Sequence, residues 1–204
     1  MASSASTIEV LRYLNEAPLA AMYESLEAIY EQHFDFVWRN VRRMGIAEFA
    51  AEDVVQDVFL VAHRRFGDFE RRSSVTTWLF GILLRVVKDH RRSHARHNAR
   101  LQGVKSEPVE PSLSHQSPLE DLARRRAVET LYELLEQLDT EKREVFAMVE
   151  LEQIPLVQAA RTLELNVNTA QARLRAARMQ FESALAAHKS RPGVEEPQGD
   201  HDAQ

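Results

Sequence analysis

Residues 75–96 of this chain read VTTWLFGILLRVVKDHRRSHAR and carry two stripes of opposite character. Apolar side chains recur at steps of three and four residues, which is the spacing of one face of an α-helix. These positions are Val75, Trp78 with Leu79, Ile82, Val86 and His90. Basic side chains recur at the same steps on a second face, at Arg85, Lys88, Arg92 and Arg96, with Arg91 beside them. The stretch therefore predicts one helix with a core face and a cationic face.

Acidic residues are almost absent from this region. Asp89 is the only acid between Arg71 and Arg100, in a chain with a formal net charge of −5. Helical spacing places successive basic side chains about 5–6 Å apart, which is comparable with the phosphate spacing of a nucleic-acid strand. We therefore expect a nucleic acid to bind the cationic face. A solvated charged surface, which most charge runs form, is the alternative that the sequence leaves open.

The composition favours a helical protein in a reducing compartment. The 204 residues include 44% hydrophobic side chains, enough for one or two cores, and only six Gly and seven Pro, which are few for a turn-rich β fold. The absence of Cys excludes disulfides and thiolate zinc sites. We find no secretory signal and no run of membrane-helix length, so we expect a cytoplasmic protein without membrane insertion.

Two predicted helical domains flank a segment without periodicity. The first domain spans residues 8–100 and the second spans residues 119–188. Residues 101–118 are rich in Pro and Ser and mildly acidic, which predicts a flexible linker. Residues 189–204 predict a disordered tail. The expected fold is therefore all-α, with two small helical domains joined by this linker.

Two further helices are predicted in the first domain. One spans residues 18–44, where Gly45 suits the end of a helix. The other spans residues 47–65, and its Val and Phe side chains can face inward. On the opposite side, four residues share a face at i, i+3, i+4 and i+7: Asp53, Gln56, Asp57 and Leu60. From these residues alone, a solvated surface is the simplest interpretation of that face.

The second domain contains a helix-turn-helix pattern. A short helix at residues 155–163, a turn at 164–167 and a longer helix at 168–188 are typical of this motif. In the longer helix, polar side chains project from an Ala-rich segment: Gln171, Arg173, Arg175 and Arg178. Gln can bind adenine through two hydrogen bonds, and Arg can bind guanine or phosphate. This pattern predicts DNA binding, with a surface helix in a bundle as the alternative.

No residue pattern points to catalysis, a cofactor or a metal. The sequence shows no P-loop, nucleophile elbow or obvious acid pair. His90, His94 and His97 recur at helical steps, but they lie among arginines that repel a cation. Trp78 is most simply a core residue, although an aromatic ring near the basic helix could instead stack on a base.

Four segments in register carry a resemblance to a known family. They are AEDVVQDVFLVAHRRF at 51–66, TWLFGILLRVVKDHRR at 77–92, KREVFAMVELEQIPLVQAA at 142–160 and NVNTAQARLRAARMQFESAL at 166–185. The chain resembles a bacterial sigma factor of the sigma-70 family, in the small two-domain extracytoplasmic-function group. The resemblance implies a sigma2-like helical bundle followed by a sigma4-like helix-turn-helix domain.

The resemblance also implies roles for particular residues. The helix at 52–65 would dock on the clamp coiled coil of core RNA polymerase through Asp53, Gln56, Asp57 and Leu60. The loop and helix that follow would melt and bind the promoter element nearer the start site, through Arg71, Arg72, Trp78, Arg85, Lys88, Arg91, Arg92 and Arg96. The second helix of the helix-turn-helix would enter the major groove of the farther element, through Asn168, Thr169, Gln171, Ala172, Arg173, Arg175 and Arg178.

Further implications concern the partners. The linker would run through polymerase toward the RNA exit path, and an anti-sigma factor is an expected partner because such proteins are commonly held by one. Polymerase would supply the catalysis, so the chain itself is not expected to be an enzyme.

The sequence departs from the family at a few positions. Arg85 replaces a common Asn, which favours phosphate binding over base capture there. Glu164 replaces a common turn Gly, and because Glu resists a positive φ the turn is expected to differ. Gln171 and Ala172 replace a common basic residue and a Ser, which implies altered readout.

Two other functions remain open from the sequence. One is a stand-alone DNA-binding regulator that uses only the helix-turn-helix and binds DNA tightly without polymerase. The other is an adaptor or sigma-like decoy that binds polymerase without starting transcripts.

Overall fold

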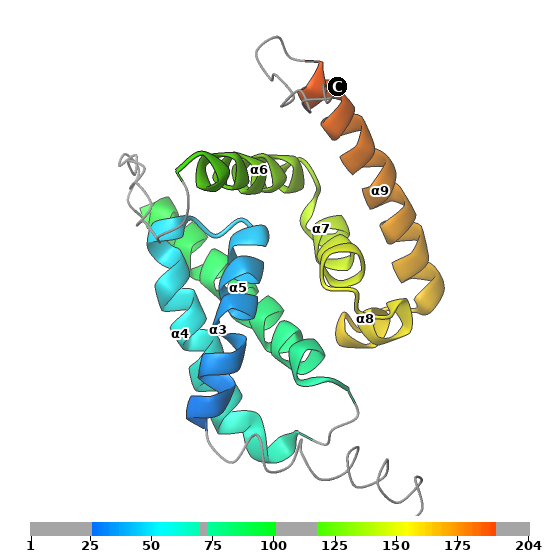
Figure 1. Ribbon diagram of the computed structural model, residues 1–204. Helices are drawn as coiled ribbons and strands as arrows, with labels where there is room; N and C mark the ends of the chain where they lie inside the picture. Colours follow the sequence, from blue (N-terminus) through cyan, green and yellow to red (C-terminus); the bar gives the residue numbers. More distant parts are fainter. Residues whose placement is uncertain (1–25, 70–72, 101–117, 191–204) are drawn as a thin grey trace, which may run out of the picture. The chain divides into compact units, whose positions relative to one another are not determined.

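The computed structural model describes residues 26–69, 73–100 and 118–190, which fold into two compact units (Figure 1). The first unit contains α3 (Leu26–Arg43), α4 (Glu48–Arg65), a 3-10 turn (Phe66–Asp68) and α5 (Val75–Arg100). The second unit contains α6 (Pro118–Glu136), α7 (Thr140–Phe146), a π-helical segment (Ala147–Leu151), α8 (Leu156–Thr162) and α9 (Val167–Lys189). Within these ranges the only regular secondary structure is helical, which confirms the predicted all-α fold.

Several predictions concern residues outside this part of the chain. They are the start of the first helix at residue 18, the linker and the C-terminal tail beyond residue 190. The described part of the chain resumes with α6 at Pro118, the last residue of the segment predicted as linker, so that residue is helical.

The chain turns from α3 into α4 at Gly45, as the sequence predicted. Gly45 has a φ of 80°, and the N–H of Ile46 donates to the carbonyl of Val41 at 3.4 Å. A helix end of this kind requires a left-handed residue, and Gly adopts that conformation without strain. Gly45 therefore ends α3 and lets the chain turn toward the start of α4.

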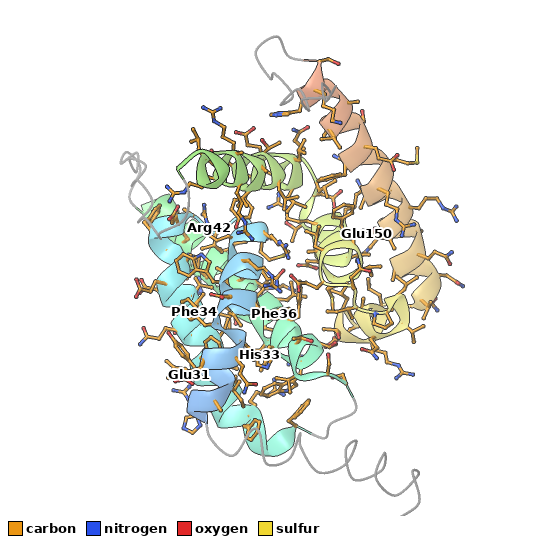
Figure 2. All side chains as sticks on the ribbon, viewed as in Figure 1. Glu31, His33, Phe34, Phe36, Arg42 and Glu150 are labelled. Atoms are coloured by element: carbon orange, nitrogen blue, oxygen red, sulfur yellow. The ribbon has the colours of Figure 1, made fainter. Side chains whose placement is uncertain are left out.

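Aromatic pairs join the three helices of the first unit. The rings of Tyr30 and Phe59 lie 4.7 Å apart and connect α3 to α4, while Phe36 and Phe80 lie 6.2 Å apart and connect α3 to α5. Phe36 is marked on α3 in Figure 2. Buried aliphatic side chains complete this core: Ile29, Val37, Val41, Val54, Val55, Val58, Leu79, Ile82 and Leu83. Each such side chain stabilises the fold by about 1.5–3 kcal/mol relative to an exposed one.

The apolar stripe of α5 is rotated relative to the predicted one. Val75, Leu79 and Ile82 are buried as expected, but Val87 continues the stripe instead of Val86. Val86 and His90 are half-buried. Almost every residue between 78 and 87 is apolar, so the spacing does not fix which side faces inward, and packing against α4 decides it.

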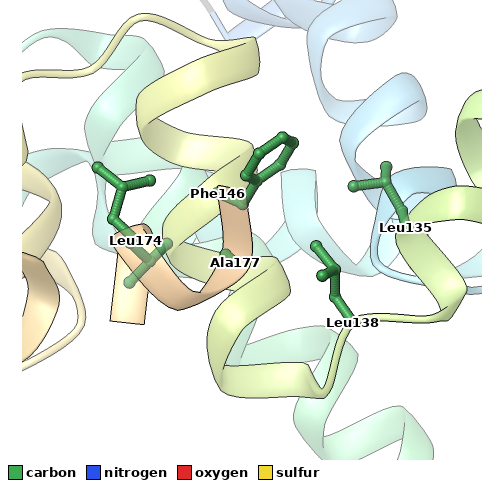
Figure 3. Close-up of a cluster of buried hydrophobic side chains, with 6 residues drawn as sticks. Leu135, Leu138, Phe146, Leu174 and Ala177 are labelled. Carbon is green, nitrogen blue, oxygen red and sulfur yellow. The ribbon is translucent and has the colours of Figure 1, made fainter. Parts of the chain in front are cut away.

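A cluster of buried side chains holds α6, α7 and α9 together (Figure 3). Its members are Leu135, Leu138, Val145, Phe146, Leu174 and Ala177. Phe146 stacks on Phe181 with ring centroids 4.8 Å apart. Small buried residues, Ala159, Ala160 and Ala170, lie where α8 and α9 pack together. Leu122 and Val167 lie outside this core, because they are 46% and 39% exposed although both are apolar.

The helix-turn-helix forms between α8 and α9, and its turn retains a left-handed residue. Glu164 has a φ of 57°, and the N–H groups of Leu165 and Glu164 donate to the carbonyls of Ala160 (2.8 Å) and Arg161 (3.1 Å). These two hydrogen bonds are those of a Schellman motif, which usually contains Gly. The expectation that Glu164 would change the turn is therefore wrong.

Side chains of Asp139 and Asn166 cap the starts of α7 and α9. Asp139 caps α7, because its Oδ1 accepts a hydrogen bond from the N–H of Lys142 at 3.0 Å. Asn166 caps α9 in the same way, accepting from the N–H of Asn168 at 2.8 Å. α9 continues to Lys189, one residue beyond the predicted end of the second domain.

Candidate nucleic-acid interface

The predicted basic side chains of α5 lie on an exposed face, here called the basic face: Arg85, Lys88, Arg91, Arg92 and Arg96. All are exposed except Arg91, which is half-buried. They point away from the buried stripe of α5 because the two sets lie on different sides of the same helix. A row of cations one helical turn apart can follow the phosphates of a nucleic-acid strand.

The acid within the basic face, Asp89, offsets at most one of its five positive charges. Asp89 lies 3.9 Å from Arg92, and both side chains are well exposed, at 77% and 64%. Exposed ion pairs of this kind contribute about 0–1 kcal/mol and are screened by salt. The Nε of Arg96 donates to the carbonyl of Arg92 at 3.2 Å, which holds the guanidinium along the helix.

The Ser74 side chain caps the start of α5, and Trp78 in the first turn of that helix lies beside two phenylalanine rings. The Ser74 Oγ accepts a hydrogen bond from the N–H of Thr77 at 3.1 Å, which is an N-cap contact. The Trp78 ring lies 5.0 Å from Phe69 and 6.3 Å from Phe66. Trp78 is half-buried, so one side packs against these rings and the rest reaches the surface. Arg71 and Arg72, predicted in the adjoining loop, lie outside the described residues.

The predicted docking residues of α4 also form one exposed face, here called the acidic face: Asp53, Gln56, Asp57 and Leu60. The opposite side of α4 contributes Val54, Val58 and other side chains to the core. Leu60 is 44% exposed despite its apolar character. The acidic face therefore offers carboxylates and an apolar side chain together, which suits a partner with basic and apolar groups.

Phe49 extends the acidic face and was missed by the sequence interpretation. It lies four residues before Asp53 and seven before Gln56, so it projects from the same side of α4. Its side chain is 55% exposed. An apolar residue at this spacing from Asp53 was the available signal. Phe49 and Leu60 thus place apolar groups at both ends of the acidic face.

Most of the predicted side chains of α9 are exposed along the helix. The exposed ones are Asn168, Thr169, Gln171, Ala172, Arg175 and Arg178, while Arg173 is half-buried. Buried Ala170, Leu174 and Ala177 face the other way and anchor the helix on α7 and α8. The exposed surface can enter a groove of duplex DNA, with amide and guanidinium groups available for base edges and phosphates.

Two of the arginines on α9 are engaged by carboxylates from other elements. Arg173 pairs with Glu141 of α7 at 2.6 Å, and Arg178 pairs with Glu150 of the π-helical segment at 2.6 Å. The sequence interpretation missed both carboxylates, since they lie far from their partners along the chain. Arg175, by contrast, makes no ion pair within the described ranges.

The structure gives no sign of a metal site or a membrane helix in the part that it describes. No group of three or more His, Asp or Glu side chains there could hold a metal ion. None of the described helices combines the length and the apolar character that crossing a membrane requires.

Comparison with known proteins places both units in one family. The model described as Sigma-70 region 2 matches residues 29–97, and the model described as Sigma-70, region 4 matches residues 129–181. Together the two matches span more than half of the chain. The chain is 29% identical over 179 residues to the ECF RNA polymerase sigma factor SigC of Mycobacterium tuberculosis, covering 87% of this chain and 92% of that protein. It is also 29% identical over 150 residues to the RNA polymerase sigma factor CnrH of Cupriavidus metallidurans, covering 72% of this chain and 78% of CnrH.

Solved structures share the fold. CnrH in complex with the cytosolic domain of CnrY superposes with a TM-score of 0.58 at 24% identity, covering 83% of this chain and 94% of that one. The sigma factor RpoE of Bartonella quintana, in complex with the anti-sigma factor NepR, superposes with a TM-score of 0.57 at 21% identity, covering 77% and 96%. These family members are initiation factors rather than enzymes. The chain therefore belongs to the sigma-70 family as an extracytoplasmic-function sigma factor, which binds core RNA polymerase, recognises promoter DNA and directs transcription initiation.

Proposed function

We propose that this sigma factor divides its work among three surfaces: the acidic face of α4 for polymerase, the basic face of α5 for the melted strand, and α9 for duplex DNA. The observation that supports this division is that faces of opposite charge lie on two helices of one unit, while the helix-turn-helix lies in the other unit. A polymerase contact and a DNA contact need opposite charges, so α4 and α5 suit different partners.

The acidic face is the docking surface for core polymerase in this proposal. Asp53 and Asp57 attract basic side chains of the partner, and Gln56 adds hydrogen bonds. Leu60 and Phe49 are exposed apolar groups whose burial would add to the affinity. The clamp coiled coil of polymerase is the partner that the family resemblance implies for this helix.

The basic face and the aromatic group beside it hold the opened promoter strand. Arg85, Lys88, Arg91, Arg92 and Arg96 bind phosphates, and the exposed side of Trp78 stacks on a base. Arg85 acts here through phosphate contact, because its guanidinium replaces the Asn that the family often has. Arg71 and Arg72, which precede α5 in the sequence, add further cations.

The α9 helix recognises the farther promoter element in the major groove. Gln171 suits an adenine and Arg175 a guanine or a phosphate. The remaining contacts come from residues around them: Asn168, Thr169, Ala172, Arg173 and Arg178. Most of these bonds position the helix on the backbone, and few carry sequence information.

The remaining assignments concern the whole chain. We propose a sigma2-like domain at residues 8–100 and a sigma4-like domain at residues 119–188, joined by a linker and followed by a tail; the structure adds Pro118 and Lys189 to the helices of the second domain. The chain acts without catalytic activity of its own, without a cofactor, and in the cytoplasm, where transcription takes place. An anti-sigma factor is an expected partner, because the RpoE structure named above contains the anti-sigma factor NepR.

Transcription from purified components tests the proposal. Core polymerase, genomic DNA and this chain are combined, and the 5′ ends of the transcripts are sequenced with and without the chain. We expect a set of new start sites that share two upstream elements. Transcripts that are unchanged by the chain would contradict the proposal, and new polymerase binding without new transcripts would favour an adaptor instead.

A further inference from the structure

The arginines of α9 differ in whether a carboxylate holds them. The Nη2 of Arg173 lies 2.6 Å from Glu141 Oε2, near the start of α7. Arg178 donates from Nε at 3.0 Å and from Nη2 at 2.6 Å to a single oxygen, Oε1 of Glu150. Glu150 is marked on the segment after α7 in Figure 2. Both carboxylates therefore come from elements other than α9, and the second pair is held by two hydrogen bonds.

The paired arginines lie on the flanks of α9. Each residue rotates an α-helix by about 100°, so Asn168, Ala172 and Arg175 lie along one outward line. Arg173 and Arg178 fall on either side of that line, toward the elements that carry their carboxylates. The side chain of Arg173 is 28% exposed and that of Arg178 is 53% exposed, so both stay within reach of solvent and of DNA.

A paired arginine attracts DNA less than an unpaired one. The arginine and its carboxylate together carry no net charge. An unpaired arginine that reaches a phosphate displaces a condensed counter-ion, and this release drives binding to DNA of any sequence. With Arg173 and Arg178 neutralised, Arg175 is the arginine of α9 that can make this contact at full charge within the described surface.

We propose that Glu141 and Glu150 are positioning residues that set promoter specificity. They hold Arg173 and Arg178, and this weakens the binding of α9 to DNA of unrelated sequence. The relevant quantity for a promoter-binding protein is the ratio between specific and non-specific affinity. Lowering the non-specific affinity raises this ratio when Arg173 and Arg178 leave their carboxylates for the DNA backbone only at the specific site, where base contacts from α9 fix the register of the helix. The inference rests on the proposed role of α9 in DNA recognition.

The test is to neutralise the two carboxylates and measure binding to DNA of mixed sequence. Glu141→Gln with Glu150→Gln, in the full chain, is compared with the wild type by fluorescence anisotropy on a labelled mixed-sequence duplex over a range of NaCl concentrations. We expect about two- to fivefold tighter binding for each freed arginine. We also expect the slope of log affinity against log salt to steepen by about 1 for each one.

A double-mutant cycle separates this role from a loss of negative charge or of stability. If Glu150 acts through Arg178, then Glu150→Gln has no effect on the salt slope in a chain that already carries Arg178→Gln. Glu182→Gln is the matched control, because Glu182 is exposed on the same helix and has no arginine partner among the described residues. We expect this control to leave the salt slope unchanged.

Two results would overturn the inference: an unchanged slope in the double Gln variant, or an equal change in the Glu182→Gln control. A second readout uses the holoenzyme. The ratio of transcripts from mapped promoters to transcripts from other sites should fall in the double Gln variant. If the wild-type holoenzyme starts no specific transcripts, the proposed function itself fails; if it does and the variant behaves identically, only the role of Glu141 and Glu150 fails.

Discussion

Glu164 ends α8 in a conformation that glycine adopts more easily. Its φ of 57° lies in the left-handed region, where a non-glycine residue is disfavoured by about 1–2 kcal/mol. The hydrogen bonds from Glu164 and Leu165 to the end of α8 hold the residue there. The helix-turn-helix thus keeps its geometry at the expense of local strain.

Replacing Glu164 with Gly should stabilise the protein. We expect Glu164→Gly to raise the free energy of unfolding by about 0.5–1 kcal/mol, because relief of strain exceeds the added flexibility of the unfolded chain. Urea denaturation of the full chain, followed by circular dichroism, measures the change. Glu182→Gly, in the regular part of α9, should instead lower the free energy of unfolding by about 1 kcal/mol. A lower free energy of unfolding in both variants would contradict the prediction.

Asp139 caps α7 and makes the stability of the second unit depend on pH. A hydrogen bond from the Lys142 side chain, and then one from its backbone N–H, hold the pKa of Asp139 below its ordinary value of 3.8. The pKa of Asp139 is lower in the folded than in the unfolded protein. The charged carboxylate therefore stabilises the fold at neutral pH, and this stabilisation is lost as the pH falls through the pKa of the folded state.

Substitutions of Asp139 should separate the stabilisation due to its capping hydrogen bond from that due to its negative charge. At pH 7, Asp139→Ala should lower the free energy of unfolding by about 1 kcal/mol, and Asp139→Asn should lower it less because Asn also caps helices. Denaturation between pH 7 and pH 3 should show the wild type approaching the Asn variant as the acid is protonated. A constant gap between them across this range would show that the charge contributes nothing.

At the scale of the element, the acidic face of α4 should govern polymerase binding. Asp53→Arg with Asp57→Arg should abolish co-purification with core polymerase and leave the helical content unchanged, because both side chains are exposed. Glu31→Arg with Asp35→Arg on α3 is the matched control, since it makes the same charge change at exposed positions four residues apart. Equal binding by both variants would remove α4 from the docking surface.

The basic face of α5 should govern promoter opening more than polymerase binding. Lys88→Ala with Arg92→Ala removes two exposed cations, and we expect a several-fold lower yield of open complexes, measured by permanganate reactivity of unpaired thymines. Arg124→Ala with Arg126→Ala removes the same charge from exposed positions of α6 and should have little effect. An unchanged yield in the α5 variant would mean that the face is only solvated.

The sequence was sufficient to predict the described helices and the two exposed faces of the first unit, because both follow from helical periodicity within a single segment. Gly45 and Asp139 likewise have the local signals of helix ends. Spacing could not predict which of Val86 and Val87 is buried, since the helix around them is apolar on most sides. Packing against another helix made that choice.

The interactions on α9 could not be read from local spacing. Arg178 and Glu150 lie 28 residues apart in the chain, and no periodic pattern connects them. The exposure of Val167 likewise depends on how α8 and α9 meet. The roles assigned to individual residues on the three surfaces stay predictions that the variants above test.

At the scale of the whole molecule, polymerase should be needed for tight promoter binding. We expect the isolated chain to bind a mapped promoter duplex weakly and the holoenzyme to bind it strongly, because polymerase holds both DNA-binding surfaces near one promoter and thereby raises their effective concentration. Electrophoretic mobility shifts at physiological salt measure the difference. Equally tight binding by the isolated chain would instead support a stand-alone helix-turn-helix regulator.

The neutralised arginines of α9 also bear on how this protein finds its target in a cell. A chromosome offers about 10⁶–10⁹ competing sites of unrelated sequence, and a strongly cationic helix would leave most of the protein scattered over them. With Arg173 and Arg178 held by Glu141 and Glu150, the free protein is attracted less strongly to that reservoir through α9. Its partition then follows the supply of core polymerase rather than the length of the genome.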